Sequence, residues 1–143
     1  MHIKMNGSSV MPFLFGTLLL FVGCDTTMQF YEGPKQPLEN VAHIKAHFGM
    51  FDQIRILEID GKALGRTDTS AWILPGAHTV TVLIENIGYL GSLGPQNIDR
   101  KALSFQALAG HTYVVNSTMK HYEDTYAWIM DKTTKEVVAG ERP

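Results

Sequence analysis

From Val41 onward the chain is divided into short segments in which apolar and polar residues alternate. The segment from His78 to Glu85 alternates best, since its aliphatic residues at every second position would share one side of an extended chain. That side carries Val80, Val82 and Ile84, and the opposite side carries Thr79, Thr81 and Glu85. A period of two predicts a strand with one buried face. No long stretch has the apolar spacing of an amphipathic helix, so the pattern favours an all-β fold.

Turn residues separate the other predicted strands. Residues 41–45 form one short strand, and residues 53–59 form another that ends at Asp60-Gly61, a dipeptide typical of tight turns. Three hairpins are predicted further on: strands 72–74 and 78–85 around Pro75-Gly76, strands 102–108 and 111–118 around Ala109-Gly110, and strands 126–130 and 136–139 around residues 131–135. Short strands with turns every eight to twelve residues predict a small antiparallel β-sandwich, with a small barrel as the alternative.

The N-terminal region has a different character. A polar start with Lys4 is followed by an apolar run over residues 11–23, which ends at Cys24. The run is shorter than the roughly 20 residues of a membrane-spanning helix, so it fits the apolar part of a signal peptide. Cys24 is the only cysteine, and an internal disulfide is therefore excluded.

The junction Val22-Gly23-Cys24 resembles the lipobox of bacterial lipoproteins. The resemblance implies cleavage after Gly23 and a diacylglyceryl group on the Cys24 thiol, which would anchor the chain to a membrane. Asp25 resembles the inner-membrane retention signal of such proteins. We therefore expect a location in the bacterial cell envelope, facing the periplasm, on the inner membrane or alternatively the outer one. A plain secretory signal or an uncleaved signal anchor stays an open alternative.

These features divide the chain into three parts. Residues 1–23 are the predicted signal peptide, residues 24–40 the lipidated cysteine with a flexible tether, and residues 41–143 the β domain. The 120 residues after Gly23 suffice for one domain with a core. They carry 11 basic and 14 acidic residues, a net charge of −3. Without a basic stripe, nucleic acid is not an expected partner.

Part of the predicted β domain resembles the PEGA-type surface module, a small β-sandwich of envelope and cell-surface proteins. The residues that carry this resemblance are Ile59-Asp60-Gly61-Lys62, Gly65, Thr67, Leu74-Pro75-Gly76, His78-Thr79-Val80-Thr81-Val82 and Gly88-Tyr89. The resemblance implies a structural or adhesive role. The start of the region after Cys24 is also similar to that of small uncharacterised proteobacterial lipoproteins, which supports the predicted compartment.

The histidines are candidate metal ligands. His43 and His47 stand four apart in a segment that looks extended, without the glutamate pattern of a zinc-protease helix. His78 and His111 each follow a turn of the form Leu-x-Gly and precede a threonine. Two such histidines without further ligands are weak evidence for a metal, so we expect solvated histidines at strand starts and neither metal nor cofactor.

Catalytic patterns are also weak. Glu58 and Asp60 are two residues apart and could share a strand face, but a turn role explains Asp60 more simply. The serines lack a nucleophile elbow or a recognisable base. Trp72 and Trp128 fall in strand patterns and are interpreted as core or sheet-surface residues. We therefore expect no enzymatic activity.

A glycine-rich segment within residues 86–98 displays Tyr89, Leu90 and Leu93 and is a possible interaction loop, unless Tyr89 packs inward. The expected function is thus a lipid-anchored, non-catalytic envelope protein that acts through contacts with an unidentified envelope protein. The alternative is a periplasmic small-ligand binder or enzyme on a β-barrel, with the histidines or the two tryptophans lining a pocket.

Overall fold

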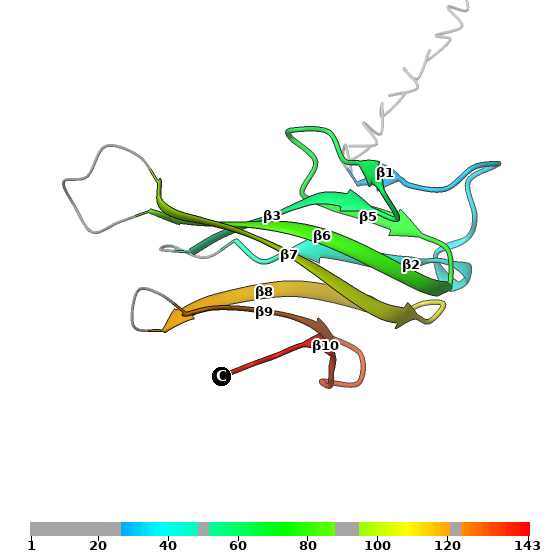
Figure 1. Ribbon diagram of the computed structural model, residues 1–143. Coiled ribbons are helices and arrows are strands. Elements are labelled where there is room, and N and C mark those ends of the chain that lie inside the picture. The colour runs from blue at the N-terminus through cyan, green and yellow to red at the C-terminus, as the bar shows by residue number, and fades with distance from the viewer. Residues whose placement is uncertain (1–26, 49–51, 88–94, 121–123) are drawn as a thin grey trace, which may run out of the picture.

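The computed structural model describes residues 27–48, 52–87, 95–120 and 124–143, and these ranges form an all-β sandwich of two sheets (Figure 1). The elements are β1 (Met28–Gln29), the 3₁₀ turn η1 (Leu38–Asn40), β2 (Ala42–Ala46), β3 (Asp52–Ile59), β4 (Lys62–Ala63), β5 (Ser70–Ile73), β6 (Gly76–Ile87), β7 (Pro95–Ala107), β8 (Thr112–Lys120), β9 (Asp124–Asp131) and β10 (Val137–Gly140). The predicted sandwich is confirmed. The sheets do not close into the alternative barrel.

The two sheets differ in how their strands are connected. Sheet A has the order β1-β5-β2-β8-β9-β10, and sheet B has the order β4-β3-β6-β7. Sheet B is antiparallel throughout. Sheet A is mixed, because β1 runs parallel to β5 and β2 runs parallel to β8. Parallel neighbours need long connections, so the wholly antiparallel sandwich expected from the sequence applies to sheet B alone.

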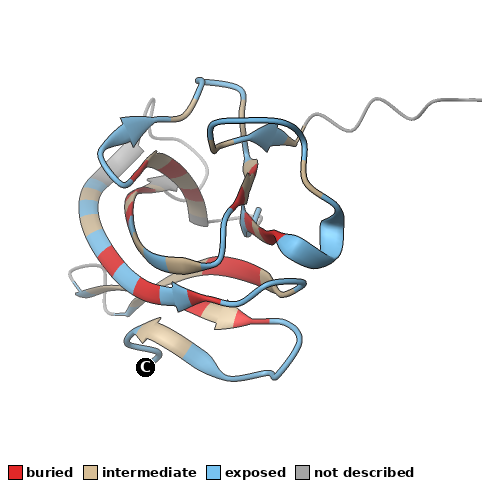
Figure 2. Cartoon of the chain, turned by 90° about the vertical axis from the view of Figure 1, so that its right-hand side faces the viewer, coloured by how far each residue is buried: buried red, intermediate tan, exposed pale blue. Residues whose placement is uncertain are grey.

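The core lies between the two sheets and follows the predicted alternation. Val80, Val82 and Ile84 of β6 are buried, while Thr79 before them is exposed and Thr81 between them is half-buried; Leu83, which is also buried, is the exception. The same alternation of buried and exposed residues runs along β7 and is visible in Figure 2. Tyr113 of β8 is the largest fully buried side chain. Burying each large apolar side chain contributes about 1.5–3 kcal/mol, and this core supplies the stability that a chain without disulfides needs.

Two of the three predicted hairpins are wrong. Leu74-Pro75 joins β5 of sheet A to β6 of sheet B, and residues 108–111 join β7 of sheet B to β8 of sheet A. Both turns therefore lead the chain from one sheet to the other, and we name them the first and second corners. The third predicted hairpin, β9 to β10, is confirmed. The sandwich also contains hairpins between β3 and β4, β6 and β7, and β8 and β9.

The segment predicted to be a flexible tether lies partly on the domain. β1 pairs with β5, the Phe30 amide donates to the Trp72 carbonyl at 2.9 Å, and the hydroxyls of Thr27 and Ser70 are hydrogen-bonded at 3.1 Å. Phe30 also packs against the core, with the Lys62 ammonium 5.2 Å from its ring centroid. Residues 27–30, within the segment predicted to be a tether, therefore lie along β5 of sheet A.

Candidate functional site

Several residues predicted to carry function lie outside the described ranges. Cys24 and Asp25 precede the first described residue, and Tyr89, Leu90 and Leu93 fall between β6 and β7. Because β6 extends to Ile87 and β7 begins at Pro95, the predicted 86–98 loop is shorter than expected. The roles of these residues stay predictions.

The first corner contains a hydrogen-bonded histidine and aspartate. Asp60 and Gly61 have φ values of 52° and 77° and form the predicted two-residue turn between β3 and β4, of the I′ type. One carboxylate oxygen of Asp60 lies 2.6 Å from His78 Nδ1, and the other accepts from the Thr79 amide at 2.8 Å. His78 Nε2 is 2.7 Å from the Leu74 carbonyl oxygen. Both ring nitrogens of His78 therefore lie within hydrogen-bond distance of an oxygen.

The second corner repeats this pairing in a buried setting. His111 Nδ1 lies 2.6 Å from one carboxylate oxygen of Asp131, and the other oxygen accepts from the Thr133 amide at 2.8 Å. The Asp131 side chain is only 3% exposed. Its backbone amide donates to the Glu136 carbonyl, which closes the turn between β9 and β10. Asp131 thus connects the second corner to the C-terminal hairpin.

The hydrogen bonds around Asp131 determine its ionisation. Burial by itself would raise the pKa of this carboxyl, but the hydrogen bonds from His111 and from the Thr133 backbone lower it by more. The pKa therefore lies below the ordinary value of 3.8, and Asp131 is charged at neutral pH. A carboxylate held in this way accepts hydrogen bonds and is not a proton donor, which is consistent with a structural role.

A row of aromatic rings links the two corners at one end of the sandwich. Phe105 of β7 lies 6.2 Å from His78 and 4.8 Å from Tyr113, and Tyr113 lies 6.3 Å from His111, measured between ring centroids. The Tyr113 hydroxyl accepts from the Leu108 amide at 2.9 Å, so it ties the second corner to β8. This bond resembles the tyrosine corners of other β-sandwiches. Burial of the hydroxyl raises the pKa of Tyr113, which keeps it neutral.

The expectation of solvated histidines is wrong at both corners. The side chains of His78 and His111 are 13% and 21% exposed, and each is bonded to an aspartate. Two aromatic rings stand between them, so they do not form a shared metal site. Within the described ranges, no group of three or more histidine, cysteine, aspartate or glutamate side chains is placed to hold a metal ion.

The remaining candidates are distributed over the sheets. His43 lies in β2 and stacks on Trp72, with 4.4 Å between the ring centroids, on the face of sheet A that points away from the core. Trp128 lies on β9 between the buried residues Ala127 and Ile129, which gives it the same outward direction. Both tryptophans are therefore sheet-surface residues, one of the two predicted possibilities. His47 follows β2 in an extended segment, where its amide donates to the Val115 carbonyl at 2.8 Å.

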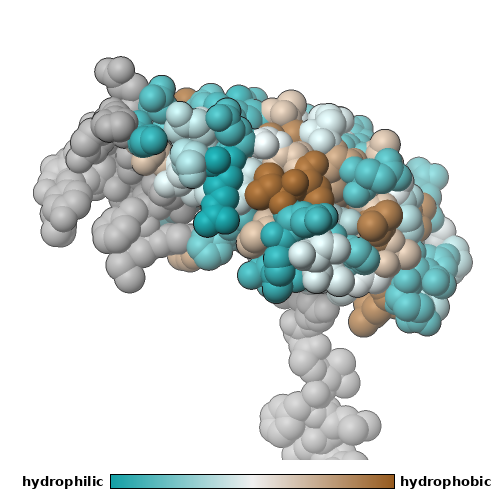
Figure 3. Space-filling view, turned by 90° about the horizontal axis from the view of Figure 1, so that it is seen from below, coloured by the Kyte–Doolittle hydropathy of each residue, from teal (hydrophilic) through white to brown (hydrophobic). Residues whose placement is uncertain are grey.

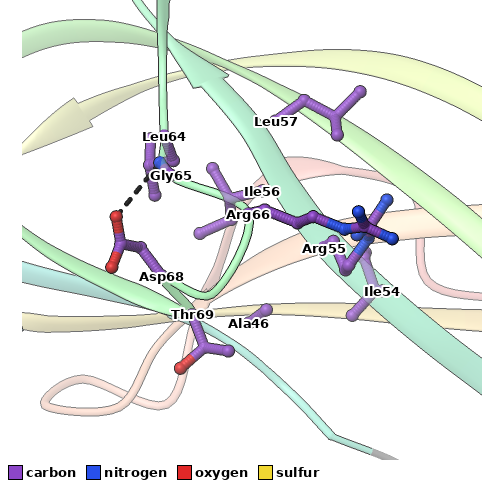
Figure 4. A pocket seen from close by; sticks show the side chains of 10 residues that line it. All are labelled: Ala46, Ile54, Arg55, Ile56, Leu57, Leu64, Gly65, Arg66, Asp68 and Thr69. Carbon is purple, nitrogen blue, oxygen red and sulfur yellow. Dashed lines mark hydrogen bonds between the residues drawn. The ribbon is translucent and has the colours of Figure 1, made fainter. Parts of the chain in front are cut away.

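A hollow of about 230 Å³ lies at the free edge of β3 (Figure 4). β4 pairs only with the last two residues of β3, so the loop over residues 64–69 lies beside the earlier part of that strand in place of a neighbour. The apolar part of the lining comes from Ala46 of β2, Ile54, Ile56 and Leu57 of β3, and Leu64 of the loop. The hollow therefore touches elements of both sheets.

Two arginines give this hollow its charge. Arg55 of β3 and Arg66 of the loop both line it, and in Figure 4 their side chains run toward the same end. Asp68 lies at the other end and accepts from the Gly65 amide at 3.0 Å. This group of residues is not predicted by any motif in the sequence. An arginine within the alternating strand 53–59 and a Gly-x-x-Asp turn after it were the only signals, and neither predicts that the loop folds against the strand edge.

Among the residues that the structure describes, no helix has the length and hydropathy of a membrane span. No known protein family, curated protein or solved structure matches this chain.

Proposed function

We propose that this chain is a lipid-anchored, non-catalytic protein of the bacterial cell envelope that acts through contacts with another envelope protein. The observation that carries the proposal is the apolar run over residues 11–23 that ends at the only cysteine, Cys24. Acylation at this position gives stable membrane attachment, because two or more acyl chains each contribute about 0.8 kcal/mol per buried CH₂ group.

The chemistry of the described residues supports a non-catalytic role. Both histidine–aspartate pairs hold turns, and in the described part of the chain neither histidine is bonded to a serine or threonine hydroxyl. The hydroxyls of Ser70 and Ser104 are instead bonded to those of Thr27 and Thr79. A nucleophile activated by a neighbouring base is therefore not assembled within these ranges.

The position of β1, near Cys24 in the sequence, would hold the domain close to the membrane. β1 begins at Met28, only four residues after Cys24. Four residues of extended chain span at most about 14 Å, which is well below the reach of a tether over residues 24–40. A lipid on Cys24 would therefore bring the edge of sheet A formed by β1 and β5 close to the headgroups. Sheet A would present its far strands, β9 and β10, to partners.

The far strands offer a surface for such a partner. In Figure 3 apolar side chains gather in the middle of the face seen from below, on the side of β9 and β10, and polar side chains ring them. Trp128 and Met130 of β9 alternate with the buried Ala127, Ile129 and Asp131 and so face away from the core, and Val137 of β10 is 42% exposed. Aromatic residues and methionine within a polar rim are typical of protein contact sites.

Metabolic labelling with a palmitate analogue tests the anchor. The full chain, expressed in a bacterium with its own lipoprotein pathway, should incorporate the label and fractionate with membranes. Cys24→Ser should lose both properties, and Asp25→Ser serves as the matched control that keeps the label. Label that persists in Cys24→Ser would refute lipidation at this residue.

Site-specific photocrosslinking in cells tests the contact surface. A photoreactive residue at position 128 should give a discrete adduct with one envelope protein, whereas the same residue at Gln106, exposed on β7, should give none. Equal crosslinking from both positions would argue against the sheet A surface.

A further inference from the structure

The hollow beside β3 has the features of a binding site that the proposed function does not use. Its walls are aliphatic on two sides, from Ile54 and Ile56 of sheet B and from Leu64 of the loop. Its polar groups are concentrated in two guanidinium groups at one end (Figure 4). Small-molecule sites are commonly built in this way, as an apolar cleft with a few converging polar groups.

The two guanidinium groups are incompletely satisfied by the described residues. The nearest carboxylate oxygen to Arg55 Nε belongs to Glu85 at 3.8 Å, which is too long for a hydrogen bond. That Nε atom is buried and has no hydrogen-bond partner in the described part of the chain. Arg66 lies on the exposed loop, with no carboxylate within ion-pair distance among the described residues. An anionic ligand would supply the missing acceptors.

The acidic residues near the hollow do not replace that ligand. Asp68 is turned toward the loop backbone, where it accepts from the Gly65 amide, and it lies away from the arginines. This bond also explains the glycine, because a Cβ at position 65 would stand 2.3 Å from the Asp68 carboxylate. Glu85 of β6 lies within ion-pair distance of Arg55 but not of Arg66, among the described residues. Arg66 therefore keeps a positive charge at the arginine end of the hollow.

The size of the hollow limits the ligand. At about 230 Å³ it is smaller than the roughly 300–1,000 Å³ of sites for drug-sized molecules, so it accommodates a single short chain. A lipid with two acyl chains is too large for it. Arginine side chains bind carboxylates through two parallel N–H donors, which fixes the direction of the bound group.

We propose that this hollow binds a medium-chain aliphatic carboxylate, with the chain against Ile54, Ile56 and Leu64 and the carboxylate between Arg55 and Arg66. The site does not depend on Cys24. If decanoate does not bind, the proposed lipid anchor is therefore unaffected. The ligand would bridge the loop over residues 64–69 and β3, which both line the hollow.

Methyl NMR of the full chain in nanodiscs of zwitterionic lipid tests the proposal with decanoate as the probe. Saturable shifts are expected at the δ1 methyl groups of Ile54 and Ile56 but not at Ile129, which is buried in sheet A. The site-resolved signals separate binding in the hollow from partition of decanoate into lipid. Absence of shifts at Ile54 and Ile56 at concentrations below decanoate micelle formation would overturn the proposal.

Matched probes and variants test whether binding needs the carboxylate, the aliphatic chain and Arg66. Decanol, which lacks the charge, and acetate, which lacks the chain, should each bind at least ten-fold more weakly than decanoate. Arg66→Gln replaces an exposed loop residue and should weaken decanoate binding by at least ten-fold. Arg100→Gln replaces an exposed residue of β7 and should leave binding unchanged. Equal binding by decanol, or no effect of Arg66→Gln, would contradict the assignment. Shifts produced by nanodiscs with anionic phospholipid, without response to decanoate, would also contradict it.

Discussion

The two corners of the sandwich contain the same hydrogen bond in opposite surroundings. At each corner a histidine Nδ1 lies 2.6 Å from an aspartate oxygen, and the second oxygen of that aspartate accepts from a backbone amide at 2.8 Å. The Asp60 side chain at the first corner is 48% exposed, whereas the Asp131 side chain at the second is 3% exposed. The two pairs thus have the same hydrogen-bond geometry, but only Asp60 is exposed to solvent.

The difference indicates how one local pattern serves two purposes. Water can replace the histidine at Asp60, so this pair adds little to the free energy of unfolding. At Asp131 water has no access, and a lost partner leaves a buried polar group unsatisfied. The first corner therefore orients a turn, and the second corner holds together strands β8, β9 and β10.

The largest effect is expected from replacing each aspartate by its amide. Asp131→Asn should lower the free energy of unfolding by about 2 kcal/mol, because one oxygen that accepts a hydrogen bond becomes a donor in a buried place. Asp60→Asn should lower it by about 0.5 kcal/mol, since solvent compensates there and asparagine tolerates the positive φ of this position. Urea unfolding of the two variants measures both values. Equal losses would show that exposure does not separate the corners.

A smaller effect is expected in acid. The pKa of Asp131 in the folded chain lies below its ordinary value of 3.8, so its contribution is complete above about pH 4 and is lost as pH falls through the folded value. The free energy of unfolding should therefore fall more steeply between pH 4 and pH 2 in the parent chain than in Asp131→Asn. Parallel acid profiles of the two chains would contradict this assignment.

The smallest effect concerns the coupling between the corners. Phe105 and Tyr113 separate the two histidines, so the aspartate substitutions should be additive to within about 0.5 kcal/mol in a double-mutant cycle. The double variant Asp60→Asn with Asp131→Asn closes the cycle. A coupling above 1 kcal/mol would show that the aromatic row transmits strain from one corner to the other.

The sequence predicted the strands well and their partners less well. The alternation in residues 78–85 and the turn at Asp60-Gly61 are local signals, and the structure confirms both. The turn at Leu74-Pro75-Gly76 predicts a hairpin by its local sequence, because a turn dipeptide does not determine which sheet the next strand joins. That choice depends on the pairing of β5 with β2 and of β6 with β7, which lie outside any local window.

The binding features were harder to predict for the same reason. Arg55 and Arg66 come from a strand and from a loop, and their proximity depends on the early end of β4. The histidine pattern was noticed, but its aspartate partners lie about 20 residues away in opposite directions along the chain. A spacing rule for metal ligands does not detect such pairs. Lipidation of Cys24, by contrast, is predicted from the neighbouring residues alone.

The parallel pairing of β2 with β8 has a consequence for the order of folding. Residues 43–46 pair with residues 112–115, about 70 positions later, whereas sheet B is made of strands that follow one another closely. Closing so long a loop carries a larger entropic cost, and folds rich in distant contacts form slowly. Sheet B can therefore assemble while the middle of sheet A still lacks a strand. A chain that emerges N-terminus first therefore lacks part of its core until both β8 and β9 have emerged.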